Sequence, residues 1–153
     1  MRLTWATPGD AAAMAQAHGG AFDASWREED FEDLLDGEGV FGLVAYGPAD
    51  APLGVILCRV AADEMEVLTL GVARESRRRG VAKALMEGAL GAARQAGARS
   101  CFLEVAVDND AAAALYAGLG FRRAGVRKRY YDRGPAGQID ALVMRRDLND
   151  APA

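Results

Sequence analysis

The sequence predicts an α+β fold, a single domain with a mixed, mostly antiparallel central sheet flanked by helices. Three observations support this prediction. Apolar runs rich in β-forming residues follow one another closely between residues 40 and 72, which indicates an antiparallel meander. A long helical pattern over residues 81–96 separates the last of these runs from another apolar strand, which indicates one parallel crossover. Two more apolar runs after residue 120 complete the predicted sheet.

The first third of the chain contains a short strand and two predicted helices. Residues 2–6 alternate between polar and apolar side chains, as a strand does. Thr7 followed by a proline is typical of a helix start, and this helix is expected to run to about residue 17 and end at the glycine pair 19–20. Residues 28–35 place three large apolar side chains at helical spacing among acidic residues, so they predict an amphipathic helix.

The remaining elements are predicted from apolar runs and from the glycines that end them. Residues 40–46 and 53–61 form a hairpin, and 65–72 add the third strand of the meander. The helix over 81–96 ends at Gly97. The later elements are a buried strand over 101–107, an Ala-rich helix over 110–119, and strands over 121–128 and 139–146 around a polar turn.

The composition is typical of one compact, water-soluble domain. The 153 residues are 51% hydrophobic and 26% charged, and a chain of this length buries about two thirds of its unfolded surface, which suffices for a core without a disulfide or metal. No apolar run approaches the roughly 18 residues that a spanning helix needs, and the N-terminus has no signal-peptide pattern. We therefore expect a cytoplasmic protein with no membrane association.

Cysteine and histidine usage argues against metal and thiol chemistry. Cys58 and Cys101 each lie inside an apolar run with no C-x-x-C spacing, so both are predicted to be core thiols. His18 is the only histidine, which excludes a His-rich zinc site and leaves a Ser-His-Asp triad one candidate centre, in an Ala-rich helix. We expect no metal.

The net charge of -4 hides an uneven distribution. Residues 1–50 contain ten acidic and two basic side chains, whereas residues 51–153 contain twelve acidic and sixteen basic ones. Such an imbalance is most often a solvated surface, and it indicates a binding function only together with a motif. Nucleic-acid binding could draw only on the basic residues 127–129 and 77–79, which is weak support in an acidic chain.

The most informative segment, residues 68–85, is a strand that runs into a basic, glycine-containing turn and then into a helix. Such a turn directs unpaired backbone N–H groups and the positive end of the helix toward an anion. Gly80 and the small Ala82 would let the backbone approach a pyrophosphate closely, and the arginines at 77–79 would add positive charge. A solvated basic loop is an equally good interpretation of this motif alone.

A second motif lies farther along, where Asn109, Ala112, Leu115, Tyr116, Gly120 and Phe121 fall in the pattern N-x-x-A-x-x-L-Y-x-x-x-G-F. With the preceding R-x-x-G-x-A, the sequence resembles the GNAT superfamily of acetyl-CoA-dependent N-acetyltransferases. The resemblance covers about residues 53–146. Because it has R-K-R-Y-Y at 127–131 and D-A-L-V-M at 140–144, the sequence is similar to one branch in particular, the bacterial ribosomal-protein alanine N-acetyltransferases. The sequence departs from that branch at residues 69–72, which are T-L-G-V where the branch commonly has N-I-A-V.

The resemblance implies a GNAT fold for a single domain over residues 1–153. The cofactor-binding core would span about 64–121, with acceptor-side elements at about 10–38 and 127–140. Acetyl-CoA would be the acetyl donor, and the N-terminal alanine of a small-subunit ribosomal protein would be the acceptor. We expect a monomer or a weak homodimer.

The resemblance also implies roles for individual residues. Tyr116 would donate a proton to the departing CoA sulfur, and Glu104 would be the general base, with Glu66 as the competing base. The residues expected to bind acetyl-CoA are Leu70, Gly71, Val72, Arg77, Arg78, Arg79, Gly80, Val81, Ala82 and Asn109. The residues expected near the acceptor are Trp26, Glu66, Tyr130 and Tyr131.

The residue patterns leave other roles open at several of these positions. Tyr116 is also compatible with helix packing, and Asn109 with a plain helix N-cap. Alternation directs Glu104 away from the face of its neighbours Leu103 and Val105, into either a polar cleft or solvent. The tyrosine pair at 130–131 is equally compatible with packing at a strand end.

The acceptor's amine decides how strong a base the site needs. Deprotonating a lysine at pH 7 costs roughly 4.6 kcal/mol, whereas an α-amine costs roughly 1.1 kcal/mol. One carboxylate therefore suits an α-amine better. Since no cysteine lies in either motif, we expect direct transfer in a ternary complex. The alternatives are a GNAT that acetylates a small-molecule amine or a lysine side chain, and a non-catalytic acetyl-CoA-binding module.

Overall fold

The computed structural model describes residues 1–19, 26–132 and 137–148, without the side chains of 129–132. Its strands are β1 (Arg2–Trp5), β2 (Val40–Tyr46), β3 (Pro52–Ala61), β4 (Glu64–Val72), β5 (Ser100–Ala106), β6 (Arg122–Asp132) and β7 (Gln138–Asp147). Its α-helices are α1 (Ala11–Gly19), α2 (Glu28–Leu35), α3 (Val81–Gln95) and α4 (Asp110–Gly118). Short 3-10 turns at Pro8–Asp10, Pro48–Asp50 and Arg74–Ser76 were not predicted.

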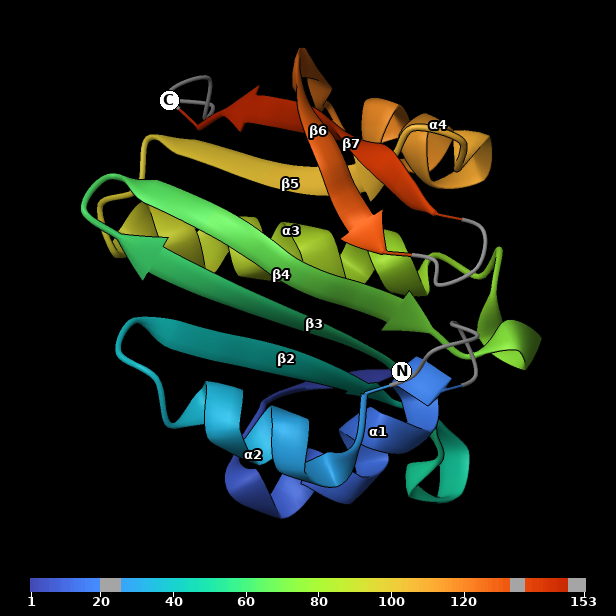
Figure 1. Cartoon of the computed structure of the whole chain (residues 1–153). Helices are drawn as coiled ribbons and strands as arrows, with labels where there is room; N and C mark the ends of the chain where they lie inside the picture. Colours follow the sequence, from blue (N-terminus) through green and yellow to red (C-terminus); the bar gives the residue numbers. More distant parts are fainter. Residues whose placement is uncertain (20–25, 133–136, 149–153) are drawn as a thin grey trace.

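The strands form one sheet in the order β1-β2-β3-β4-β5-β7-β6 (Figure 1). Neighbouring strands are antiparallel except for β4 and β5, which are parallel and joined through α3. The predicted α+β class, the antiparallel meander and the single crossover are therefore confirmed.

Helices cover the sheet on both faces. In Figure 1, α3 lies behind β4, and α1 and α2 lie at the lower end of the sheet. The core on the α3 face includes Met65, Leu85 and Leu103, and side chains of α4 pack against it. The opposite face carries a second core, in which Met14 of α1 and Phe31 of α2 pack on β2 and β3. Leu68 of β4 also packs against this second core.

The start of α3 is held close to the sheet by a glycine. A Cβ atom at Gly54 of β3 would lie 3.0 Å from Val81 Cγ1 and 3.1 Å from both the Gly71 carbonyl oxygen and Leu85 Cδ1. Any larger residue would push α3 outward, because these neighbours are already in contact. Gly54 thus fixes where the N-terminus of α3 lies relative to the end of β4.

Strands β4 and β5 pair only where they begin. The parallel register joins Glu64 to Ser100, Met65 to Cys101 and Glu66 to Phe102, and within the described residues it goes no further. Strand β5 stays paired with β7 along its whole length, while β4 continues six residues beyond Glu66 to Val72. The second half of β4 therefore has an edge, facing β5, without a strand partner in the described structure.

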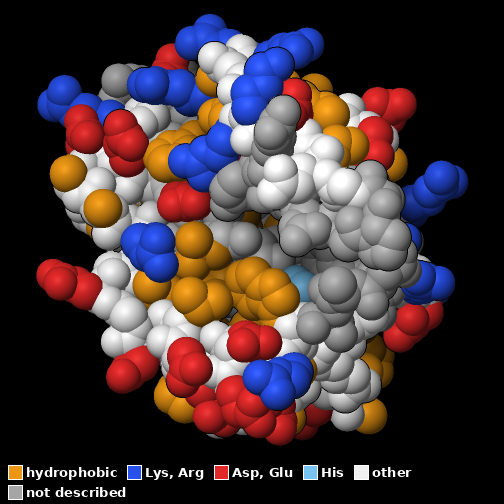
Figure 2. Space-filling view, in the orientation of Figure 1, with side chains coloured by type: hydrophobic (Ala, Val, Ile, Leu, Met, Phe, Trp, Pro, Cys, Tyr) orange, Lys and Arg blue, Asp and Glu red, His pale blue; other side chains and the backbone are white. Residues whose placement is uncertain are grey.

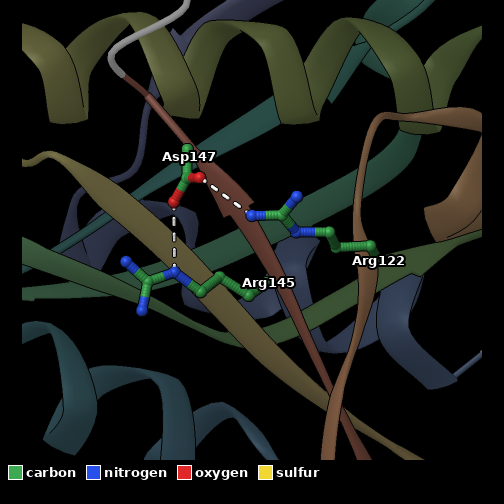
Figure 3. A network of polar contacts seen from close by, with 3 residues as sticks. All are labelled: Arg122, Arg145 and Asp147. Atoms are coloured by element: carbon green, nitrogen blue, oxygen red, sulfur yellow. Dashed lines mark hydrogen bonds and ion pairs between the residues drawn. The ribbon is translucent and has the colours of Figure 1, made fainter.

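The far edge of the sheet is tied together by polar contacts. Asp147 accepts hydrogen bonds from Arg122 Nη2 at 3.1 Å and from Arg145 Nε at 3.2 Å (Figure 3). Arg146 Nη1 donates to the Leu119 carbonyl at 2.9 Å, which links β7 to the end of α4. The exposed ion pairs of Asp147 contribute at most about 1 kcal/mol each, so they add little to the stability of the fold.

Cys58 and Cys101 are both buried and free, as predicted for core thiols. Burial raises the pKa of Cys101 to about 12 and the pKa of Cys58 well above its usual value, so both remain protonated at neutral pH. In the described part of the chain, no helix is long and apolar enough to cross a membrane.

Candidate functional site

The turn between β4 and α3 has the geometry of an anion-binding site. Gly80, the N-cap of α3, has φ +79°, and Arg78 before it has φ +63°. The first backbone hydrogen bond of the helix joins Ala84 N to the Gly80 carbonyl, so the N–H groups of residues 81–83 have no acceptor within the helix. Arginines 77–79 are exposed around them. The turn therefore presents backbone donors and positive charge together.

Gly80 has a conformational reason to be glycine, besides the predicted close approach of a pyrophosphate. A Cβ atom there would meet nothing within 4 Å, so the glycine does not relieve crowding inside the protein. The positive φ favours glycine at this position, because a side chain in this conformation is strained. The space in front of the turn is open, and Ala82 of the first helical turn packs partly on the core.

The partnerless edge of β4 presents main-chain groups rather than side chains. Leu70 is buried in the α3-side core, and Val72 packs against it. Ala73 N donates to the Leu53 carbonyl of β3 at 2.9 Å. Because alternate residues of an antiparallel strand bond to the same neighbour, the backbone groups of Leu70 and Val72 point to the other edge, toward β5. They form a short, preformed row of donors and acceptors beside the turn.

Glu104 lies on β5 in a covered position. Its neighbours Leu103 and Val105 are buried on the α3 face, and Glu104 points to the opposite face, as alternation predicts. The side chain is only 9% exposed, and its Oε1 pairs with Nη1 of Arg127 from β6 at 3.0 Å. Glu104 is therefore not on the open solvent surface, which was one of the two predicted surroundings.

The competing base, Glu66, lies at the last paired step of β4 and β5, opposite Phe102. It is half-buried, and alternation along β4 directs it to the same face as Glu104, away from buried Met65 and Val67. The structure thus brings the two carboxylates to one face of the sheet.

Tyr116 and Asn109 belong to α4, on the other face. Asn109 is the N-cap of this helix, since its Oδ1 accepts from Ala112 N at 3.1 Å. Tyr116 packs against the α3-side core and meets Phe121 edge-to-face, with ring centroids 6.0 Å apart. Glu104 and Tyr116 therefore lie on opposite faces of the sheet.

A buried histidine beside the site was not predicted. His18, at the end of α1, is 2% exposed, stacks on Trp26 with centroids 5.1 Å apart, and meets the edge of Phe31. Its Nε2 lies 2.9 Å from Thr69 Oγ1, and its Nδ1 accepts from Trp26 N at 3.3 Å. The signal in the sequence was Thr69, a lone polar residue within the apolar run of β4.

A bulge in β4 brings Thr69 to this histidine. Thr69 is opposite Leu57 of β3, but Val67 is opposite Cys58, so Leu68 is an extra residue in β4. A bulge changes the face to which the following residues point. Leu68 packs on the α1 side, and Thr69 bonds to His18 on that same side.

Burial lowers the pKa of His18 to about 4, which predicts a stability loss in weak acid. The unfolded imidazole takes up a proton below about pH 6.5, whereas the folded one stays neutral until about pH 4. The contribution of His18 to the free energy of unfolding is therefore complete above pH 6.5. It is lost as the pH falls, and the loss reaches about 3 kcal/mol at pH 4. Urea unfolding measured between pH 7.5 and 4 checks this, with His18→Phe as the non-titrating control. Equal pH slopes for the two proteins would contradict it.

Trp26 packs on His18 and also lines a hollow in the protein surface. One side of its ring stacks on His18, and with Asp30, Asp33 and Leu34 it lines a hollow of about 330 Å³. The side chains of Tyr130 and Tyr131 lie outside the described residues, so their predicted place near the acceptor stays a prediction.

The uneven charge of the sequence is separated in space. In Figure 2, acidic side chains gather at the lower end, over α2, and basic side chains gather at the upper end, over β6 and β7. Apolar surface and a hollowed region lie between them. No group of His, Cys, Asp and Glu side chains in the described ranges could hold a metal ion.

Comparison with known proteins points to one family. Residues 11–121 match the sequence model of the acetyltransferase (GNAT) family. Over 87 residues, 57% of this chain and 51% of the relative, the sequence is 45% identical to the N-alpha-acetyltransferase RimI of Mycobacterium tuberculosis (strain ATCC 25618 / H37Rv). Over 88 residues, 58% of this chain and 59% of the relative, it is 34% identical to the [ribosomal protein bS18]-alanine N-acetyltransferase of Escherichia coli (strain K12). The chain thus spans between half and three fifths of these relatives.

The similarity in structure extends over nearly the whole chain. The crystal structure of the ribosomal-protein-S18-alanine N-acetyltransferase from Escherichia coli superposes with a TM-score of 0.86 at 26% identity. The match covers 99% of this chain and 96% of that protein.

Proposed function

This chain belongs to the GNAT family of acetyltransferases, and from that premise we propose that it transfers the acetyl group of acetyl-CoA to the N-terminal α-amine of a protein. The acceptor that we propose is the N-terminal alanine of a small-subunit ribosomal protein. One observation carries the proposal: β4 and β5 diverge, with an anion-binding turn at the end of β4 and a covered carboxylate on β5. The names of the two relatives support the acceptor class.

The described groups fit acetyl-CoA. The pyrophosphate would bind the N–H groups at the start of α3, with arginines 77–79 balancing its charge. The backbone groups of Leu70 and Val72 would bind the pantetheine and acetyl portions along the open edge of β4, whereas those of Gly71, between them, face β3. Asn109 would contact the cofactor arm at the start of α4.

Glu104 and Tyr116 would divide the proton transfers between the two faces of the sheet. Glu104 would take a proton from the acceptor's ammonium, so that the neutral amine attacks the thioester carbon. The N–H of Leu70 would stabilise the oxyanion that forms. Tyr116 would protonate the sulfur as the C–S bond breaks. Glu66 is the alternative base.

A panel of acceptors tests this function. An Ala-starting basic peptide should be acetylated with a higher kcat/KM than either a small polyamine or the same peptide with a blocked N-terminus and a free lysine. Preference for the polyamine or the lysine would favour the alternative acceptors. Acetyl-CoA binding by calorimetry with no turnover on any acceptor would indicate a non-catalytic binding module.

The acidic surface of α2 would attract a cationic acceptor peptide. We expect Glu28→Lys/Glu29→Lys to raise the KM for a basic peptide about three- to tenfold, and to leave the KM for acetyl-CoA within twofold, since each exposed charge acts weakly. Asp30 is left in place because its Oδ2 accepts from Arg27 N at 2.8 Å and caps the helix. Steady-state kinetics at low and high salt measure the effect.

The control for this prediction is Glu64→Lys/Glu87→Lys, which makes the same change in net charge at two exposed sites outside α2. It should leave the KM for the peptide unchanged. An equal rise for both double variants would mean that the acidic surface of α2 is only a solvated face.

The remaining features of the proposal are expectations from the sequence. The chain acts as a single N-acetyltransferase domain with its cofactor-binding core at about 64–121 and acceptor-side elements at about 10–38 and 127–140. It works in the cytoplasm as a monomer or a weak homodimer, with no nucleic acid and no metal.

A further inference from the structure

The hydrogen bonds of His18 define its tautomer. The backbone N–H of Trp26 can only donate, so His18 Nδ1 must be the acceptor of that 3.3 Å contact. A neutral imidazole then carries its single proton on Nε2, which donates to Thr69 Oγ1 at 2.9 Å. Within the described part of the chain the Thr69 side chain makes this hydrogen bond, and because the hydroxyl oxygen accepts in it, the hydroxyl hydrogen can still be donated.

The hydroxyl of Thr69 lies on the sheet face where the acceptor is proposed to bind. It lies next to Leu70, whose backbone groups face the open edge of β4, and it points to the sheet face that also holds Glu104. This is the face opposite Tyr116, on which the acceptor amine would meet its base. A hydroxyl whose oxygen is already occupied by a buried imidazole is a preorganised donor, because it cannot turn to accept from that side instead.

We propose that Thr69 is a positioning residue for the acceptor, whose hydroxyl, oriented by His18, donates a hydrogen bond to a backbone carbonyl oxygen of the acceptor peptide. The inference rests on the proposed function, since it concerns that same acceptor. His18 acts only through Thr69, and no bond is made or broken at either residue. Protein or peptide acceptors carry such a carbonyl beside the reacting amine, whereas simple alkyl amines and polyamines do not.

The test compares Thr69→Val with Thr69→Ser. Valine keeps the shape of threonine without the hydroxyl, and serine restores the hydroxyl. We expect Thr69→Val to raise the KM for an Ala-starting peptide about three- to tenfold, the usual effect of one hydrogen bond. The KM of Thr69→Val for acetyl-CoA should stay within twofold of the parent value. The KM of Thr69→Ser for the peptide should stay near that of the parent protein.

A double-variant cycle tests whether His18 acts through Thr69. His18→Phe keeps an aromatic ring between Trp26 and Phe31 but has no N–H to donate. It should raise the peptide KM like Thr69→Val, and the two changes together should be no worse than either alone. Because the chain has one histidine, its ¹⁵N-labelled imidazole gives an isolated NMR signal, and this signal should report the Nε2–H tautomer.

Several outcomes would overturn the inference. The first is an unchanged peptide KM in a folded Thr69→Val protein. A fall in the kcat of Thr69→Val without a change in KM would mean that the hydroxyl contacts the reacting acetyl group and not the peptide. Equal changes in the KM for the peptide and the KM for acetyl-CoA would indicate a purely structural role. An Nδ1–H tautomer would remove the orienting bond. If the parent protein acetylates no peptide at all, the proposed function fails as well, whereas active parent protein with an unchanged Thr69→Val refutes only this inference.

Discussion

Glu104→Gln is expected to lower kcat with an Ala-starting peptide by about 10²- to 10⁴-fold at pH 7, the usual contribution of a general base. Glutamine keeps the size and the covered position of the side chain but cannot accept the proton of the ammonium. It also removes the charge that pairs with Arg127 Nη1 at 3.0 Å, so thermal unfolding should be measured on the same samples. The KM for acetyl-CoA should change little, because Glu104 is not among the groups proposed to bind that molecule.

The pH dependence separates a base from a structural residue. Above the α-amine's usual pKa of about 7.8 the acceptor is already neutral, so the deficit of Glu104→Gln should shrink as pH rises toward 9. Glu66→Gln is the matched control, because it makes the same change in the other carboxylate on this face. Full activity in Glu104→Gln together with a large loss in Glu66→Gln would exchange their roles.

Tyr116→Phe is expected to lower kcat by about 10²-fold or more, because the thiolate of CoA would leave without a proton. The phenylalanine ring can keep the edge-to-face contact with Phe121 and the packing on the core, so folding should survive. An acetyl thioester of a more acidic thiol, which leaves readily as the thiolate, should recover much of the lost rate. Stopped-flow or steady-state assays with both donors measure this.

Tyr46→Phe provides the control for the same chemical change elsewhere. Tyr46 lies on β2 and donates to Asp10 Oδ1 at 2.7 Å. Burial, together with this hydrogen bond, raises the pKa of Tyr46 to about 12. Its loss should reduce stability and leave kcat unchanged. Turnover by Tyr116→Phe at the parent rate would contradict the role of Tyr116 as proton donor.

Much of the fold was predictable because the chain signals its elements locally. The meander over 40–72 and the crossover helix were predicted from apolar runs and from glycines that end elements, and their bounds differ by at most one residue. The largest difference is β6, predicted to end at residue 128, which continues to Asp132. The basic R-K-R sequence there lacks apolar alternation, and pairing with β7 extends the strand instead.

Part of the candidate site was also predictable, because two motifs place its residues on known elements. The turn between β4 and α3 and the helix α4 lie where the spacing predicted them. The covered position of Glu104 was not decided by alternation, because it depends on Arg127, which reaches it from β6. Long-range pairing of this kind has no signal in the spacing of residues.

The His18 cluster was missed for a related reason. An isolated histidine in an Ala-rich helix gives no indication of its neighbours, and the β4 bulge that turns Thr69 toward it arises from pairing with β3. A register shift of one residue changes the face of every residue that follows, and local patterns do not report it.

The central claim, acetylation of an α-amine, is tested most directly by locating the acetyl group on a product. A peptide that begins with alanine and contains one internal lysine is incubated with acetyl-CoA and the protein, and tandem mass spectrometry then assigns the added acetyl group. We predict acetyl on the N-terminal amine alone during the initial, linear phase, and no product from the peptide with a formylated N-terminus. Acetyl on the lysine, or equal modification of the formylated peptide, would contradict the account.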